Sequence, residues 1–294
     1  MNKKSLVGKG RAAISMVVDP DSFTEGVVGD LKVTDKEFGP GAVVGTARLN
    51  GEICTVIAID AMKINRKFRV VYAGIIGLEE GYKMALAVYH SIKADSAKPR
   101  NEKRPLVLIV DTPGNGPGKL EEIFGMNKAT GAYQLALAGA RKAGHPVVAL
   151  VVGRAISGGF LCHGLQADHV LCLGPQFGTL VHVMPLTSIA RITKLDIDWL
   201  QELAESNPVF AAGPDYFYRL GGIDEMIDSI DAMRERVIAH VAGIREKKAE
   251  GKQEELGPWG RGALGEKRGG RVARARVMET MDREFAAVAG RYLS

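Results

Sequence analysis

The sequence predicts an α/β domain whose central strands run parallel. Buried strands at 106–110, 147–152 and 169–173 alternate with helical stretches at 120–142 and 160–165. This alternation is typical of βαβ units, because two parallel strands need a crossover connection between them. Glycine-rich or polar turns follow the strands, and such loops meet at one edge of a parallel sheet. α/β proteins usually place their sites at that edge.

Length and composition indicate a globular protein with one large domain or one domain with extensions. The chain has 294 residues, of which 46% are hydrophobic and 25% charged, as is usual for this class. No apolar run reaches the 18 residues of a membrane span, and the basic start lacks an apolar core, which indicates a cytoplasmic protein. The three cysteines lack metal-ligand spacing and are expected to be buried thiols: Cys54, Cys162 and Cys172.

The amino-terminal part combines loops with one predicted hairpin. Residues 1–50 mix glycine with short apolar groups and predict a loop-rich lead-in with some helix. Residues 53–60 predict a buried strand, and Asn50-Gly51 before it is a hairpin signal, so residues 42–49 are the expected partner strand.

The remaining elements follow from periodicity and from turn residues. They are a helix at 75–92, a surface loop at 95–104, a fifth strand at 177–183, a helix at 196–205 with Asp196 as its cap, a loop at 207–214, a helix at 224–245, a mobile polar linker at 248–270 and an amphipathic helix at 271–293. We therefore divide the chain into the lead-in (1–50), a main domain (51–247) and a basic linker with a C-terminal helix (248–294).

The strongest functional signal lies in the stretch Val147–Leu165. Its strand ends in a short polar turn, and Gly158-Gly159 then opens a short helix. The first amides of a helix have no partner within it, and glycines let a ligand approach them closely. Such a helix start can act as an oxyanion hole, which stabilises a carbonyl oxygen that becomes negative. Ser157, Gly158 and Gly159 are therefore candidate catalytic residues.

Several other features resemble functional motifs but lack residues that those motifs require. The loop Gly114–Lys119 has neither the glycine spacing nor the Ser or Thr of a phosphate-binding P-loop. Residues 155–159 resemble a nucleophile elbow, but no histidine and acid are placed to activate Ser157, which we interpret as a turn or cap residue. His163 is expected to be structural. His182 is either a core histidine or a proton-transfer group.

The net charge of +5 is concentrated near the C-terminus. Residues 261–276 contain six Lys or Arg against the single acid Glu266. This segment could attract an anionic partner, including nucleic acid, but the pattern favours a solvated tail.

Three stretches in the observed order resemble a known family: Asp111–Gly118 (DTPGNGPG), Gly153–Asp168 (GRAISGGFLCHGLQAD) and Val181–Lys194 (VHVMPLTSIARITK), with Asn207–Gly213 (NPVFAAG) in support. They are similar to the carboxyltransferase α-type half of acyl-CoA carboxylases, which belong to the crotonase (ClpP-like) superfamily, and more closely to the malonate decarboxylase γ subunit. Acyl-CoA carboxylase subunits usually carry Pro-Glu-Gly where this chain has His182–Pro185, which favours the decarboxylase subunit.

The resemblance implies a crotonase-like fold of repeated ββα units with a C-terminal helical extension. It implies pairing with a β subunit, with an acyl carrier protein and with an acyl transferase subunit, without nucleic acid or membrane. The substrate would be a malonyl thioester on the CoA-like prosthetic group of the carrier, with no metal and no cofactor bound directly to this chain. The expected contacts to the thioester are Gly114, Gly116, Ile156 and Phe160.

The implied reaction releases CO₂ and leaves an enolate on the thioester. Related carboxyltransferases have two oxyanion holes, one per subunit, and Gly158 and Gly159 could form either one, for the thioester enolate or for the carboxyl donor or acceptor. His182 is the first candidate for moving the proton of the enolate, with water equally suitable. We prefer the interpretation in which the malonyl group is decarboxylated directly, without biotin. Two alternatives remain open: a carboxyltransferase that passes the carboxyl group to biotin, and a non-catalytic scaffold subunit.

Overall fold

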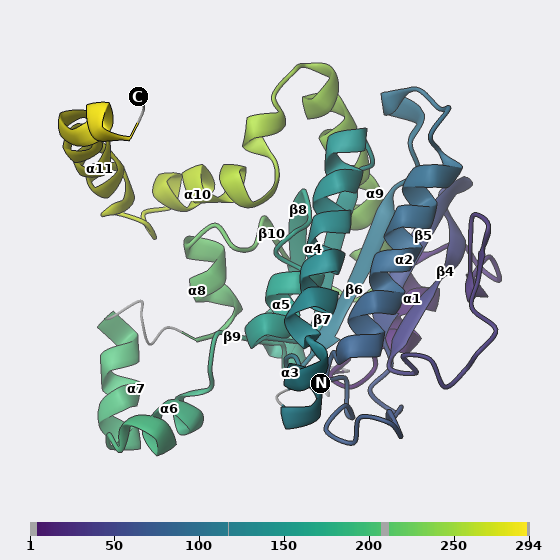
Figure 1. Cartoon of the computed structure of the whole chain (residues 1–294), viewed down its shortest axis with the longest axis horizontal. Helices are drawn as coiled ribbons and strands as arrows, with labels where there is room; N and C mark the ends of the chain where they lie inside the picture. The colour runs from purple at the N-terminus through teal and green to yellow at the C-terminus, as the bar shows by residue number, and fades with distance from the viewer. Residues whose placement is uncertain (1–4, 117, 207–211, 293–294) are drawn as a thin grey trace.

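The central element of the computed structural model is an eight-stranded sheet. The structure describes residues 5–116, 118–206 and 212–292. The strand order is β1, β4, β5, β6, β7, β8, β10, and the short strand β9 pairs with the last residues of β7 (Figure 1). The strands of this sheet are Thr24–Glu25 (β1), Ala42–Leu49 (β4), Glu52–Ile59 (β5), Leu106–Thr112 (β6), Val147–Ile156 (β7), His169–Leu173 (β8), Leu180–His182 (β9) and Glu225–Ile227 (β10). Two further strands, Val27–Val28 (β2) and Leu31–Lys32 (β3), form a small separate sheet.

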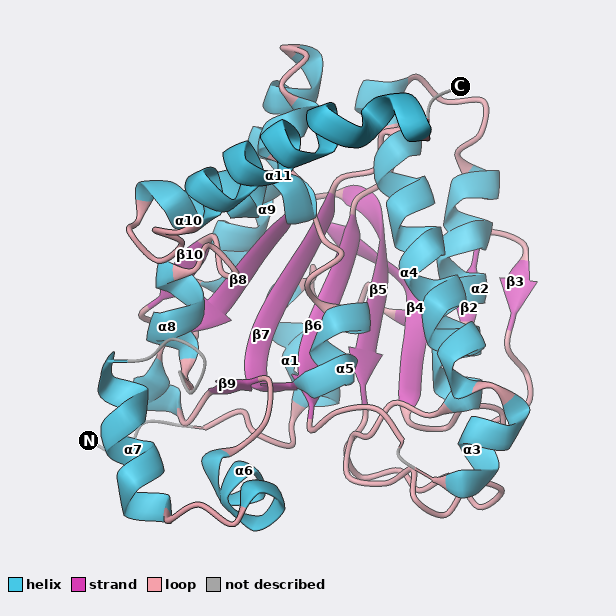
Figure 2. Cartoon of the chain, turned by 60° about the vertical axis from the view of Figure 1, so that its left-hand side comes forward, coloured by secondary structure: helices cyan, strands magenta, loops and turns pink. Residues whose placement is uncertain are grey.

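Helices cover both faces of the large sheet (Figures 1 and 2). The α-helices are Gly10–Val17 (α1), Leu78–Ala94 (α2), Lys119–Phe124 (α3), Met126–Ala143 (α4), Ser157–His163 (α5), Leu186–Thr193 (α6), Ile197–Ser206 (α7), Pro214–Arg219 (α8), Met233–Ala249 (α9), Gly257–Lys267 (α10) and Arg274–Val288 (α11). Short 3-10 helices lie at Arg100–Glu102 (η1), Pro175–Phe177 (η2), Gln253–Glu255 (η4) and Ala289–Arg291 (η5).

The parallel core and the hairpin beside it follow the sequence prediction. Strands β5, β6, β7, β8 and β10 pair in parallel, whereas β4 and β5 pair antiparallel with Leu49 opposite Glu52. Asn50 and Gly51 between them have φ angles of 52° and 80°, the left-handed conformation that a tight hairpin turn requires. The predicted hairpin is therefore confirmed.

Alternate residues of the strands enter two hydrophobic cores. Along β6, Leu106, Leu108 and Val110 belong to the core beneath α2 and α4, which lie side by side in Figure 1. The intervening Val107 and Ile109 belong to the core on the other face, with residues of α1 and α9. This alternation follows from the two-residue period of a strand, and burial on both faces explains why β6 is continuously apolar.

Three predicted elements have other boundaries in the structure. The helix expected at 120–142 is two helices, because Gly125 has a φ of +88° and separates α3 from α4. Strand β7 continues to Ile156, through the expected polar turn, because β9 pairs with its last residues. The helix expected at 224–245 begins only at Met233, because residues 225–227 pair with β8 as β10.

The predicted linker at 248–270 is a packed helical segment. It contains η4 and α10, and Arg261 in α10 is buried with 4% of its surface exposed. The amphipathic helix expected after it is present as α11, none of whose residues is buried.

The helix predicted at 196–205 corresponds to α7, and Asp196 Oδ1 accepts hydrogen bonds from the amides of Asp198 and Trp199, as expected of a cap. Most of the loop predicted at 207–214 lies outside the described residues.

Candidate functional site

Three chain segments meet at the carboxyl edge of the sheet. Thr112 at the end of β6 pairs with Ala155 of β7, and Ile156 of β7 pairs with His182 of β9. The loop after β6, the start of α5 and the end of β9 therefore lie together, near the bottom of the sheet in Figure 2. Strand pairing thus places Gly114, Ser157 and His182 at one edge of the sheet.

The start of α5 presents backbone amides that no side chain caps. Ile156 is the N-cap residue, and no side chain of the described residues makes a capping hydrogen bond. Ser157 has a φ of +53°, which turns the chain sharply from strand to helix. The Ser157 side chain is exposed, and its hydroxyl makes no hydrogen bond to a described histidine. The geometry provides a helix start with free donors and the positive end of the helix dipole.

The space beside the two glycines of this start is filled by the protein itself. A Cβ at Gly159 would lie 2.8 Å from the carbonyl carbon of Gly114 and 2.8 Å from Thr112 Oγ1. A Cβ at Gly158 would lie 2.4 Å from Asn115 Oδ1. The sequence argument that the missing Cβ atoms admit a ligand is therefore wrong: these directions are filled by the loop after β6.

That loop is held by its own hydrogen bonds. The Gly114 amide donates to Thr112 Oγ1, and the Gly114 carbonyl accepts from the Ile76 amide at 3.0 Å. The Gly116 amide donates to the Ile76 carbonyl at 2.8 Å. Both glycine amides are thus occupied, so these residues shape the loop instead of donating to a substrate. Asn115 beside them, which sequence reasoning missed, places its side chain against Gly158.

A buried ion pair fixes the strands behind this edge. Asp111 is fully buried, and its Oδ1 accepts hydrogen bonds from the backbone amide and the Nε of Arg154, both at 3.0 Å. Asp111 Oδ2 and Arg154 Nη2 have no partner among the described residues. The pair joins the ends of β6 and β7, and sequence analysis offered no signal for it beyond the two charges in apolar strands.

The two histidines near the glycine pair have different environments. His163 is fully buried; its Nε2 donates to the Ile109 carbonyl and its Nδ1 accepts from the Tyr133 hydroxyl. Burial lowers the pKa of His163 to about 4, so it is a neutral structural residue, as expected. His182 is half-buried, its Nδ1 has no partner among the described residues, and burial lowers its pKa below the usual range. A neutral imidazole with a free nitrogen can move a proton.

The two other residues predicted to contact the thioester, Ile156 and Phe160, differ in exposure. Ile156 is partly exposed at the end of β7, whereas Phe160 is 2% exposed and its ring packs against Phe217 at 6.0 Å between centroids. The Phe160 side chain therefore belongs to the core, and its expected contact with the thioester stays a prediction. All three cysteines are buried and free, as expected. Burial raises the pKa of each thiol, to about 12 for Cys54 and Cys162.

Comparison with known proteins assigns the chain to a family. The model of the malonate decarboxylase gamma subunit matches residues 72–284. The chain belongs to the malonate decarboxylase γ-subunit family. Malonyl-S-ACP:biotin-protein carboxyltransferase MADD of Malonomonas rubra is 64% identical to this γ-subunit chain over 284 residues, which cover 97% of each protein.

Solved structures support the same assignment. A chain of the Pseudomonas malonate decarboxylase MdcD-MdcE hetero-dimer is 30% identical, with a TM-score of 0.62 over 85% of this chain and 96% of that one. Transcarboxylase 12S is 21% identical, with a TM-score of 0.62 over 83% of this chain and 43% of that one, and this likeness concerns the fold alone. The γ-subunit chain therefore has the crotonase-like carboxyltransferase fold that its motifs predict.

The described part of the γ-subunit chain shows neither a metal cluster nor a membrane span. No three His, Cys, Asp or Glu side chains within residues 5–116, 118–206 and 212–292 lie close enough to hold a metal ion. None of the helices in these ranges is long and apolar enough to cross a bilayer.

Proposed function

We propose that the chain is the γ subunit of an enzyme that removes the carboxyl group of a malonyl thioester and transfers it to biotin on a partner protein. The observation that carries the proposal is the uncapped start of α5, whose glycine amides lie beside the loop after β6. The relative MADD, at 64% identity, supports malonyl-S-acyl carrier protein as donor and a biotin protein as acceptor.

The chemistry of the first step suits this helix start. Cleavage of the bond between the α-carbon and the carboxyl group leaves CO₂ and an electron pair that the thioester carbonyl takes up as an enolate. Two amide donors aimed at that oxygen stabilise the enolate more than the neutral thioester; loss of one such donor costs on the order of 3 kcal/mol in known enzymes. We assign Gly158 and Gly159 to this oxygen, with Ser157 as the turn that orients them.

The second step completes the balance of atoms. Biotin loses its ureido proton and forms a bond to CO₂, and the α-carbon of the enolate gains a proton, giving acetyl thioester and carboxybiotin. His182 is the side chain that we assign to relay that proton, because its half-buried imidazole stays neutral near pH 7 and its buried Nδ1 makes no hydrogen bond to a described residue. Ile156 and the loop through Gly114 and Gly116 form the adjacent walls.

Exposed apolar side chains near this edge support a partner subunit that covers it. Val183 and Met184, directly after β9, have 71% and 41% of their surface exposed, and Ile192 on α6 has 63%. No residue of α6 is buried. Patches of this kind often mark protein interfaces, and the similar Pseudomonas structure is a hetero-dimer. We infer a β subunit, together with an acyl carrier protein and its acyl transferase, as partners.

The experiment is an assay of the complex that co-purifies with the tagged chain, supplied with malonyl-S-acyl carrier protein. We expect formation of acetyl-S-acyl carrier protein together with labelled carboxybiotin, and we expect avidin to block both. Direct release of CO₂ that resists avidin is the second candidate; the similar Pseudomonas hetero-dimer is named a malonate decarboxylase. If the complex consumes no malonyl thioester with or without avidin, both candidate reactions are contradicted and a scaffold role is favoured.

A further inference from the structure

A basic cavity lies at the opposite edge of the sheet from the candidate site. It has a volume of about 350 Å³ and lies beside the amino ends of β7 and β8, between the C-terminal ends of α4 and α9. A smaller cavity of about 240 Å³ shares Arg100 and Lys248 with it. The larger volume is at the lower end of the range for small-molecule sites.

The lining of the larger cavity carries excess positive charge. Four cations line it, Arg100, Arg141, Lys142 and Lys248, against a single carboxylate, Asp168. Asp168 is already neutralised, because Arg141 Nε lies 3.1 Å and Lys248 Nζ 2.9 Å from its oxygens. Burial lowers the pKa of Lys248, and the charges of Arg141 and Arg100 lower it further, against the opposite effect of Asp168.

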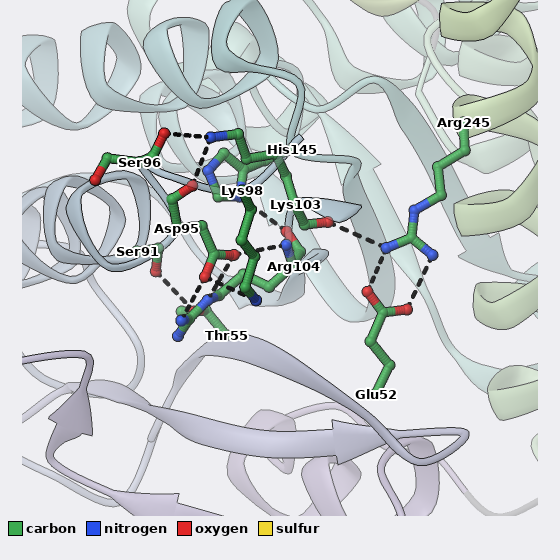
Figure 3. Close-up of polar contacts among 10 residues, drawn as sticks. All are labelled: Glu52, Thr55, Ser91, Asp95, Ser96, Lys98, Lys103, Arg104, His145 and Arg245. Atoms are coloured by element: carbon green, nitrogen blue, oxygen red, sulfur yellow. Dashed lines mark hydrogen bonds and ion pairs between the residues drawn. The ribbon is translucent and has the colours of Figure 1, made fainter. Parts of the chain in front are cut away.

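Two of these cations have no partner within the protein. Arg100 and Lys142 are exposed, and neither side chain makes a hydrogen bond or an ion pair to any residue that the structure describes. In contrast, Arg245 beside the smaller cavity is held by Glu52 and by the Lys103 carbonyl (Figure 3). The unpaired charge is therefore concentrated on the lining of the larger cavity.

The wall behind the cavity is rigid. Lys248 Nζ also donates to the His145 carbonyl at 2.7 Å, and Asp168 Oδ2 accepts from the Val147 amide at 3.0 Å. His145 is itself fully buried with Nδ1 bonded to the Arg104 carbonyl. Of the cations that line the cavity, Arg141 and Lys248 are held on this frame by Asp168 and are therefore preorganised for an anion, which lowers the entropy lost on binding.

We propose that this cavity binds a small anion with a diphosphate group, through Arg100, Arg141 and Lys142. A multivalent anion matches an excess of three positive charges better than a single carboxylate does. Arginine guanidinium groups also recognise phosphate oxygens with two parallel hydrogen bonds. The site is separate from the malonyl site, since it lies at the amino ends of the strands instead of the carboxyl ends.

The test is calorimetric titration of the full chain with inorganic pyrophosphate at low salt. We expect saturable binding to one site that weakens as salt is added, and a loss of about tenfold or more in affinity in the Arg100→Gln/Lys142→Gln variant. The matched control is Lys36→Gln/Arg276→Gln, which removes two exposed cations elsewhere and should bind as the parent does. Both variants should keep the parent's melting temperature, because none of these side chains is paired or buried.

Titrations with ADP and with citrate then identify the class of anion. Binding of ADP at least as tight as that of pyrophosphate indicates a nucleoside diphosphate, and weaker binding indicates a free diphosphate; both support the proposal. Absence of saturable pyrophosphate binding, or binding that the Arg100→Gln/Lys142→Gln variant retains in full, overturns it. Citrate binding as tight as pyrophosphate binding overturns the diphosphate assignment.

Discussion

At the scale of single residues, the packing of the site depends on two glycines that have no Cβ atom. The Gly158-Gly159 pair was found in the sequence for its helix start, yet both absent Cβ atoms make room for the loop after β6. A sequence shows that a glycine is present, but not which residue occupies the volume that a Cβ would fill. Here that residue lies more than forty positions earlier in the chain. Asn115 was missed for the same reason: only the fold brings it to Gly158.

The two glycines should respond differently to alanine. In Gly158→Ala the new methyl group meets only the Asn115 side chain, whereas in Gly159→Ala it meets the Gly114 backbone, which cannot move freely. We expect Gly158→Ala to lower the melting temperature and Asn115→Ala to restore it in the double variant. Gly159→Ala should stay destabilised with or without Asn115→Ala. Thermal unfolding of the four variants measures this, and equal rescue of both glycine variants would contradict the packing.

His182 should show its role in the pH dependence of the complex. Replacement by glutamine keeps a polar side chain but cannot relay a proton, so we expect kcat to fall by about a hundredfold or more. Burial lowers the pKa of His182, so the parent should stay active through pH 7 and lose activity only below pH 6.5, as the imidazole becomes charged. The variant should lack that acidic limb.

The control for this experiment is His90→Gln, which removes a histidine of α2 that contacts Asp30 far from the glycine pair. It should leave kcat and the pH profile unchanged. A His182→Gln variant with the parent's kcat and acidic limb would assign the proton transfer to water.

At the scale of elements, the basic C-terminal segment is built into the fold. The Arg261 guanidinium donates to the carbonyls of Leu165 and Ala167, and Arg268 donates to those of Ile223 and Asp224. Composition alone predicts a solvated tail here, because it shows charges but not the unpaired carbonyls that these charges satisfy. Burial lowers the pKa of Arg261 to about 10, so the side chain is still charged at neutral pH.

Arg261→Met should therefore destabilise the chain. The variant removes the donor of the buried Ala167 carbonyl and of the partly buried Leu165 carbonyl. A buried carbonyl without a donor costs roughly 1–3 kcal/mol, so we expect the free energy of unfolding to fall by about 3 kcal/mol. Urea unfolding measures the change. The control Arg276→Met, at an exposed position on α11, should stay within about 0.5 kcal/mol of the parent. Equal effects of the two substitutions would show that the segment is a solvated tail after all.

At the scale of the whole molecule, the sequence predicts the parallel core well and its edges poorly. Strands β6, β7 and β8 are apolar enough to identify without their partners, and Asn50-Gly51 identifies the β4–β5 hairpin locally. Strand β10 is three residues long and exists because β8, about fifty residues earlier, offers it a free edge. Such short strands have no periodicity of their own, so pairing between distant segments decides them.

A buried ion pair in the connection between α2 and β6 should govern stability in acid. Asp95 at the end of α2 is fully buried and accepts bonds from Arg104 Nε and Nη2 and from Lys98 Nζ (Figure 3). Burial alone would raise the pKa of Asp95, but these donors outweigh it and hold the pKa well below the usual range. The stabilisation is therefore complete above about pH 4, the pKa of an unfolded aspartate, and is lost as the pH falls towards the folded value.

Asp95→Asn leaves the Arg104 guanidinium, whose side chain is 9% exposed, without its counter-charge. Breaking a buried pair in this way costs about 3–5 kcal/mol, so we expect that difference from the parent between pH 5 and 7. Urea unfolding from pH 7 down to pH 2.5 should show the difference shrinking below pH 4, because only the parent loses an interaction there. Asp282→Asn, at an exposed position on α11, provides the baseline and should follow the parent at every pH. A difference that stays constant across this range would mean that Asp95 acts through its shape and hydrogen bonds instead of its charge.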